Sequence, residues 1–292
     1  MAKNRKDDHY PVVRQGRLFR QSPALENRVE VRFEQILSKS NRRLYRHTRG
    51  YHVKIDIDPT STQTYNVYAL SDSWMTKNAL KMGYAMYLEN SKDERDRLKG
   101  QQVARWEDFR TQSGASADAL DPIQYNLENG AVNPRQILTA GEFADTAVTD
   151  AAGNRRNFWW KTVGSAVRYS LLEEYDKAGN AQPSPDTSTT DMPYDDLMAD
   201  DSATMAADLQ TKGNLPPYDA TGVNSNEPWV RVATLASGAA QKLSTGFFVA
   251  PCGFVIITAG GGFENELVQE EFLSWTAKAG DYKGVHAPSL LE

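Results

Sequence analysis

Arginine residues near the start of the chain are the side chains whose type and spacing point most clearly to a chemistry. They fall into two groups: Arg14, Arg17 and Arg20, and then Arg42, Arg43, Arg46 and Arg49. A guanidinium group can donate two parallel hydrogen bonds to one phosphate, which suits arginine to a nucleic-acid backbone. Tyr45 and Tyr51 lie in and beside the second group, and their rings offer faces on which unpaired bases could stack. The pattern predicts a nucleic-acid interface that follows phosphates and has no sequence preference.

Other side chains offer weaker chemical possibilities. Asp56 and Asp58 are two residues apart in an expected strand, so they share one face and could act as paired catalytic carboxylates or hold a divalent cation. Exposed charged positions on a half-buried strand explain them more simply, and this is the interpretation we favour. The single cysteine, Cys252, lies between two apolar stretches and is interpreted as a small buried thiol. The four histidines are scattered, so we predict no metal site, no cofactor and no catalytic residues.

Charge is distributed unevenly along the 292 residues. Residues 1–50 contain 13 lysines and arginines against 5 acidic residues, whereas the net charge of the whole chain is −5. We therefore expect a basic arm beside an acidic body. The mean hydropathy is −0.60 and the sequence has no apolar run of about 18 residues, which argues against a membrane-spanning helix. The charged start of the chain lacks the apolar segment of a signal peptide, so we expect a soluble, intracellular product.

Alternation of apolar and polar residues predicts that the chain is built mainly of strands. The expected strands cover residues 28–33, 52–58, 65–70, 157–163, 167–175, 229–235, 246–250, 253–258 and 271–276. Residues 39–49 are interpreted as a basic connection between strands. Helical spacing appears in one block, residues 71–110, in which Ser91 and Glu94 form a capping-box pattern. Residues 183–228 contain six prolines and nine acidic residues and are interpreted as a long acidic loop.

Strands that do not alternate with helices favour an antiparallel sandwich over a parallel α/β fold. The predicted fold class is all-β: an antiparallel jelly-roll sandwich with a helical insertion over about residues 71–110 and the acidic loop insertion at 183–228. Residues 1–50 are expected to form a basic N-terminal arm that includes a first strand. Residues 51–292 are expected to form the jelly-roll domain.

Two stretches of the sequence resemble a known family. Residues 65–111 contain a short strand, a tryptophan-bearing turn, helices and an Arg-Trp…Asp-Phe segment, and residues 244–258 read STGFFVAPCGFVIIT. Both are similar to blocks in the capsid proteins of circular, Rep-encoding single-stranded DNA viruses. The resemblance implies a jelly-roll subunit without enzymatic activity that assembles into an icosahedral shell around a nucleic-acid genome. The arm of this chain is more dilute than the arginine-rich tail of many such capsids, because it contains Asp7 and Asp8.

The sequence therefore predicts a viral capsid protein located in the virion, and in the host nucleus or cytoplasm during assembly. Its expected partners are further copies of itself and a nucleic acid, single-stranded DNA bound without sequence preference, but no membrane. Two alternatives stay open. One is a β-sandwich enzyme that uses strand-borne carboxylates such as Asp56 and Asp58, and the other is a monomeric nucleic-acid-binding module.

Overall fold

The architecture is known from a computed structural model. It describes residues 11–20, 28–57, 64–98, 106–115, 118–125, 135–138, 143–150, 152–161, 164–179, 228–236, 243–259 and 273–292. All but the last residue of the predicted acidic loop at 183–228 lies outside the described residues, as do Asp7, Asp8 and Asp58.

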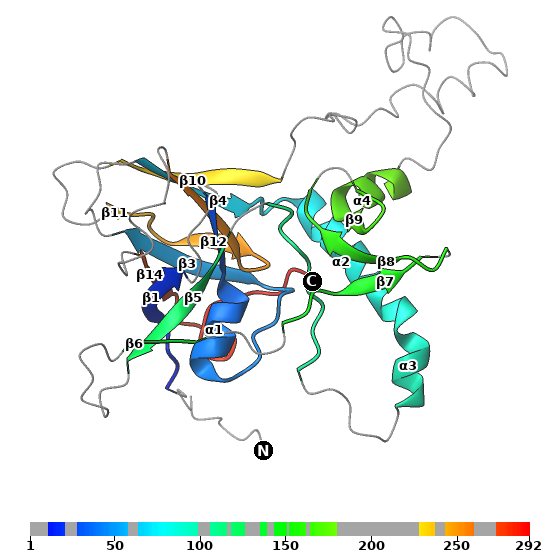
Figure 1. Cartoon of the computed structure of the whole chain (residues 1–292), viewed down its shortest axis with the longest axis horizontal. Helices are drawn as coiled ribbons and strands as arrows, with labels where there is room; N and C mark the ends of the chain where they lie inside the picture. Colours follow the sequence, from blue (N-terminus) through cyan, green and yellow to red (C-terminus); the bar gives the residue numbers. More distant parts are fainter. Residues whose placement is uncertain are drawn as a thin grey trace, which may run out of the picture.

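One large sheet dominates the described part of the chain (Figure 1). Its strands run in the order β10-β4-β13-β2-β5-β1-β14-β3-β11, with β12 also paired to β3 and β6 to β5. The end strands β10 and β11 contact each other, so the sheet is nearly closed on itself. The bounds of its strands are β1 Gln15–Arg20, β2 Arg28–Arg32, β3 Gly50–Ile57, β4 Thr64–Leu70, β5 Asp118–Tyr125, β6 Arg135–Ile137, β10 Trp229–Ala236, β11 Leu243–Ser244, β12 Phe248–Pro251, β13 Phe254–Ala259 and β14 Leu273–Ala277.

The large sheet contains two sets of four antiparallel strands. One set has the order β1-β14-β3-β12 and the other β2-β13-β4-β10, and β5 joins the sets by pairing with both β1 and β2. Each step from β1 to β2, β3 and β4 moves the chain to the other set, as does each step from β12 to β13 and β14. The mostly β-sheet prediction is therefore confirmed.

The core lies between the inward faces of the two sets. Alternate residues of β3 (Val53, Ile55 and Ile57) are fully buried, and Val29 of β2 and Trp275 of β14 belong to the same apolar cluster. Burial of alternate residues is what strict apolar–polar alternation predicts for a strand with one face toward a core. The strands expected from this signal at 28–33, 52–58, 65–70, 229–235, 246–250, 253–258 and 271–276 are confirmed as β2, β3, β4, β10, β12, β13 and β14.

A tight turn at Cys252 and Gly253 carries the chain from β12 in one set to β13 in the other. Both residues have positive φ, 56° and 75°, and the N–H of Gly253 donates to the Ala250 carbonyl at 3.0 Å. A Cβ on Gly253 would collide with the backbone and carboxylate of Glu34, so only glycine fits this position.

Between β4 and β10 the chain builds a second body of helices and short strands beside the large sheet (Figure 1). Leu80, Phe109, Phe158, Trp160 and Leu171 form its buried core, which continues into the large sheet through Leu70 and Phe254. The bounds of its elements are α2 Trp74–Asn90, α3 Lys92–Arg97, β7 Ala147–Thr149, β8 Arg155–Trp159, β9 Arg168–Ser170 and α4 Leu171–Gly179.

The helical block predicted over residues 71–110 is correct only in its first part. Ser73 caps α2 by accepting a hydrogen bond from the N–H of Thr76, as its side-chain type predicts. The capping-box prediction for Ser91 and Glu94 is wrong, because the Ser91 hydroxyl instead donates to the Tyr87 carbonyl at 2.7 Å. The helices end at Arg97, and residues 106–110 are not helical.

Two further helices replace predicted connection or strand. α1, Phe33–Asn41, extends into the first residues of the stretch 39–49 that was interpreted as a basic connection. Its buried Phe33, Ile36 and Leu37 have helical spacing. The strand predicted over 167–175 ends at Ser170, whose hydroxyl accepts a hydrogen bond from the N–H of Glu173 and so begins α4. Side-chain capping overrides the β-favouring composition there.

Candidate nucleic-acid interface

The loop that carries the second arginine group is held rigidly against the end of α1. Arg42 has left-handed backbone geometry (φ 50°), and the N–H groups of Arg42 and Arg43 both donate to the Ser38 carbonyl. The Ser38 hydroxyl accepts a hydrogen bond from the N–H of Tyr45 at 2.9 Å. The loop therefore presents its side chains from a fixed backbone, with Arg42 exposed.

Arg46 lies over the boundary between the large sheet and the inserted body. Its Nη1 is 3.3 Å from Asp108 Oδ1, and the side chain of Arg46 is 52% exposed whereas that of Asp108 is 1% exposed. Asp108 Oδ2 also accepts a hydrogen bond from the N–H of His47 at 2.8 Å. Burial raises the pKa of Asp108, while the His47 N–H and the charges of Arg110 and Arg46 oppose that rise. Arg46 thus has both a structural partner and a face toward solvent.

Arg49 makes its described contacts with the backbone and an aromatic ring of the C-terminal segment. Its Nη1 donates to the Ala287 carbonyl at 2.7 Å, and its guanidinium lies 3.7 Å from the centre of the Tyr282 ring. A guanidinium at this distance from a ring is attracted by the ring quadrupole. Arg49 therefore fastens the C-terminal segment to the start of β3.

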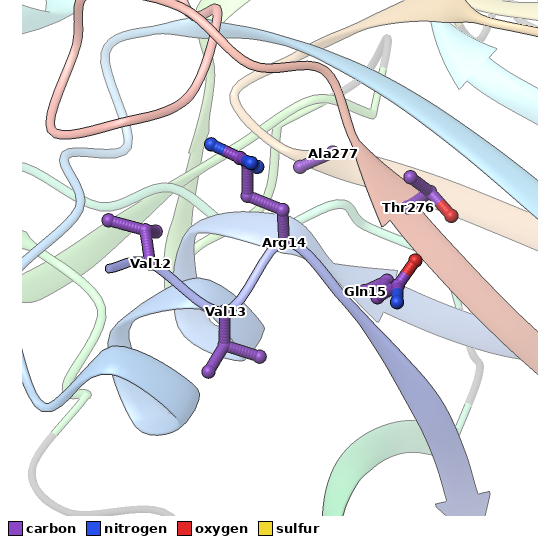
Figure 2. Close-up of a pocket in the computed structure, with 6 residues that line it drawn as sticks. All are labelled: Val12, Val13, Arg14, Gln15, Thr276 and Ala277. Carbon is purple, nitrogen blue, oxygen red and sulfur yellow. The ribbon is translucent and has the colours of Figure 1, made fainter. Parts of the chain in front are cut away.

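The first arginine group lies on and just before β1. Arg14 is exposed, Arg17 is half-buried, and Arg20 is the last residue of the strand. Figure 2 shows Arg14 beside a surface pocket that is also lined by Val12, Val13, Gln15, Thr276 and Ala277.

A pair of hydrogen bonds brings the two arginine groups close together. The N–H of Val13 donates to Asn41 Oδ1 at 2.8 Å, and Asn41 Nδ2 donates to the Val13 carbonyl at 3.0 Å. Arg14 and Arg42 are the next residues along each segment, and both are exposed. The fold therefore joins two basic stretches that are 28 residues apart in sequence.

The prediction that Tyr45 and Tyr51 offer ring faces to bases is wrong. Both side chains are 1% exposed and belong to the main core. Their hydroxyl groups donate to backbone carbonyls, Tyr45 to Lys283 and Tyr51 to Arg46. Burial raises the pKa of Tyr45 to about 12. These tyrosines hold the loop in place, and any nucleic-acid contact there would have to be made by the cations.

Lys283 is a basic residue that sequence reasoning missed. It lies at the tip of a hairpin in which Tyr282 and Val285 exchange backbone hydrogen bonds at 3.0 Å, and its Nζ donates to the Leu44 carbonyl. We call Arg42, Arg43, Arg46, Arg49 and Lys283 together the loop–hairpin patch. The only signal in the sequence was the Lys-Gly pair at 283–284, which suits a two-residue turn with positive φ at both positions.

The remaining chemical candidates are structural in the described residues. Asp56 is 3% exposed, and its Oδ2 is 2.9 Å from Lys54 Nζ, so it is not the exposed carboxylate that was expected. Cys252 is fully buried, as predicted, and burial raises the pKa of its thiol well above the usual value. Among the described residues no group of three or more histidine, cysteine or carboxylate side chains could hold a metal ion. None of the described helices is long and apolar enough to cross a membrane.

A buried polar network underlies the loop–hairpin patch. His47 Nε2 is 2.7 Å from the Thr111 hydroxyl, and His47 Nδ1 is 3.4 Å from Glu34 Oε1. This acid–imidazole–hydroxyl sequence has the connectivity of a nucleophile triad, but its three side chains are at most 1% exposed. The Thr111 oxygen is buried in this structure, and the network joins α1 to the inserted body.

Comparison with known proteins yields no relative from which a function could be transferred. No family model matches the chain, and neither the curated proteins nor the solved structures include a significant match.

Proposed function

We propose that this protein is the coat subunit of a virus: a jelly-roll protein that assembles into an icosahedral shell around single-stranded DNA. The observation that carries the proposal is the strand order. Eight strands in chain order, β1 to β4, β10 and β12 to β14, divide into the sets β1-β14-β3-β12 and β2-β13-β4-β10. Two interleaved four-stranded sets are the arrangement of the eight-stranded jelly roll, which viral capsids, lectins and cupins use.

The surface supports assembly over a small-ligand function. Large hydrophobic side chains that are more than half exposed occur on both the sheet and the inserted body: Trp74, Trp106, Val167, Val230 and Phe247. A subunit of a closed shell contacts several neighbours and needs apolar side chains on more than one face.

The basic residues support enclosure of a nucleic acid. The hydrogen bonds between Val13 and Asn41 bring the backbone beside Arg14 close to the start of the loop–hairpin patch, and Arg14, Arg42 and Arg46 are exposed. Phosphate contacts of this kind are electrostatic and independent of base sequence. On this proposal the protein resides in the virion, and its partners are other copies of itself and its genome.

A second candidate is a monomeric nucleic-acid-binding module, which the same patch favours. The enzyme alternative receives no support from the described residues, because Asp56 is buried and paired with Lys54.

Sedimentation velocity of the purified full chain separates the two candidates. A coat protein should sediment as particles or as oligomers that build into particles when the salt concentration or pH is changed. A single species of 32.6 kDa under all such conditions would refute the coat-protein proposal and leave the monomeric module.

A further inference from the structure

The hairpin at Tyr282–Val285 places a lysine among arginines that come from a distant part of the chain. Lys283 has φ 50° and Gly284 has φ 87°, values typical of a tight two-residue turn. The turn lies against the loop after α1. Three contacts lock the hairpin there: the Tyr45 hydroxyl donates to the Lys283 carbonyl, Lys283 Nζ donates to the Leu44 carbonyl, and the N–H of Arg46 donates to the Tyr282 hydroxyl. The position of the Lys283 side chain is therefore built into the fold.

The partners of Lys283 and Arg49 orient these two cations without cancelling their charge. Lys283 Nζ and Arg49 Nη1 both donate to backbone carbonyls, and both cations also lie against the ring of Tyr282, at 5.3 Å and 3.7 Å from its centre. Arg46 is paired with the carboxylate of Asp108, which is buried. Lys283, Arg49 and Arg46 thus supply three positive charges beside this one buried carboxylate.

The electrostatics of Lys283 agree with this geometry. Burial lowers the pKa of Lys283, and the charges of Arg46, Arg43 and Arg49 lower it further, while Asp108 acts in the opposite direction. Like charges held near one another repel, and the anionic phosphates of a nucleic acid placed among them would relieve the repulsion.

We propose that the loop–hairpin patch is a phosphate-binding site with Lys283 at its centre, and that its ligand is a backbone phosphate of single-stranded nucleic acid. The inference deepens the proposed function and rests on it for the identity of the nucleic acid. Arg42 and Arg43 supply further cations at the rim, Arg46 is shared between Asp108 and the phosphate, and Arg49 positions the hairpin through Tyr282. The bases make no ring contact with Tyr45 or Tyr51, because these side chains are in the core.

A phosphate fits this site better than the carboxylate of an acidic peptide. The cations come from two segments of the chain, and a nucleic-acid backbone offers them successive phosphates, each with two non-bridging acceptor oxygens. Inorganic phosphate and the nucleic-acid backbone share this chemistry, so the test must separate them.

The test compares Lys283→Met with Lys278→Met in the full-length protein, stripped of bound nucleic acid in high salt. Methionine keeps the length of the side chain and removes its charge, and Lys278 is an exposed lysine of the same C-terminal segment. Affinity for a fluorescent oligothymidylate is measured by anisotropy over a series of NaCl concentrations, and inorganic phosphate is added as a competitor in a parallel series. Melting curves establish that both variants are folded.

We expect Lys283→Met to weaken oligothymidylate binding about fivefold or more and to reduce the salt slope by about 0.7, the contribution of one single-strand phosphate contact. Lys278→Met should change the affinity less than about twofold. Equal losses in the two variants would overturn the site, because they would reflect net charge alone. A second result would also overturn the site. If inorganic phosphate no longer competes in Lys283→Met while the affinity for oligothymidylate is unchanged, the ligand of Lys283 is the free ion and not the nucleic-acid backbone.

A second measurement needs no substitution. Acetylation of lysines in the wild-type protein, followed by mass spectrometry, should show that oligothymidylate protects Lys283 and leaves Lys278 reactive. Particles that assemble normally but leave Lys283 unprotected would refute the site and leave the coat-protein proposal intact. A chain that stays monomeric yet protects Lys283 would support the site and refute assembly.

Discussion

Replacing Thr111 with valine should destabilise the protein out of proportion to the size of the change. Thr111 is fully buried, and its hydroxyl lies 2.9 Å from Trp160 Nε1 and 2.7 Å from His47 Nε2. An indole N–H can only donate, so the hydroxyl accepts from Trp160, and it also shares a hydrogen bond with His47 whose direction depends on the imidazole tautomer. Valine has nearly the same shape as threonine but can do neither.

The magnitude follows from the two groups that would lose their partner. A buried polar group left without a hydrogen bond costs about 1–3 kcal/mol, so Thr111→Val should lower the free energy of unfolding by about 2–6 kcal/mol. Thr111→Ser keeps the hydroxyl and removes one methyl group, which should cost about 1 kcal/mol. The difference between the two variants isolates the polar network from the packing.

Urea unfolding followed by tryptophan fluorescence measures both variants at one protein concentration. The expected result is a clearly lower midpoint for Thr111→Val than for Thr111→Ser, with an unchanged slope. Equal midpoints, or a more stable valine variant, would refute the reasoning, because His47 and Trp160 would then have other partners.

Three further outcomes follow from buried or paired groups. Because burial raises the pKa of Cys252, a thiol reagent should label the chain only after unfolding, and labelling of the folded chain would contradict the structure. Burial, His286 and Lys278 lower the pKa of His52, so the unfolded state binds more protons and stability should fall as the pH drops below about 6.5. His52→Gln should flatten that loss between about pH 7 and pH 5, and an unchanged profile would exclude His52 as its source. Arg49→Met should lower stability by about 1–2 kcal/mol through the lost Tyr282 and carbonyl contacts, whereas exposed Arg42→Met should change it little when both are compared by thermal melting.

The strands of the large sheet could be predicted because their signal is local. Val53, Ile55 and Ile57 alternate with polar residues, and the same alternation that is visible in the sequence buries them in β3. The helices α1 and α4 were missed because short amphipathic helices compete with strand-like composition. The signal for α1 was the helical spacing of Phe33, Ile36 and Leu37. The signal for α4 was Ser170, whose hydroxyl accepts a hydrogen bond from the N–H of Glu173.

The candidate site could be predicted only in part, because its residues come from distant segments. The arginines at 42–49 were recognised from their density, but nothing in their neighbourhood reveals that Arg49 would stack on Tyr282. Lys283 looked like an ordinary turn residue, and its place beside Tyr45 depends on a contact that spans 238 positions. The tyrosines were misread for the same reason: interleaving in sequence says nothing about which side chains the core will bury.

The most direct test of the account is electron microscopy of the purified full-length protein, taken to a reconstruction if particles form. The account predicts closed particles with icosahedral symmetry, in which each subunit shows the strand sets β1-β14-β3-β12 and β2-β13-β4-β10. It also predicts density for nucleic acid against the loop–hairpin patch. A protein that yields no closed particle under any assembly condition, or a shell whose loop–hairpin patch faces away from the enclosed nucleic acid, would contradict it.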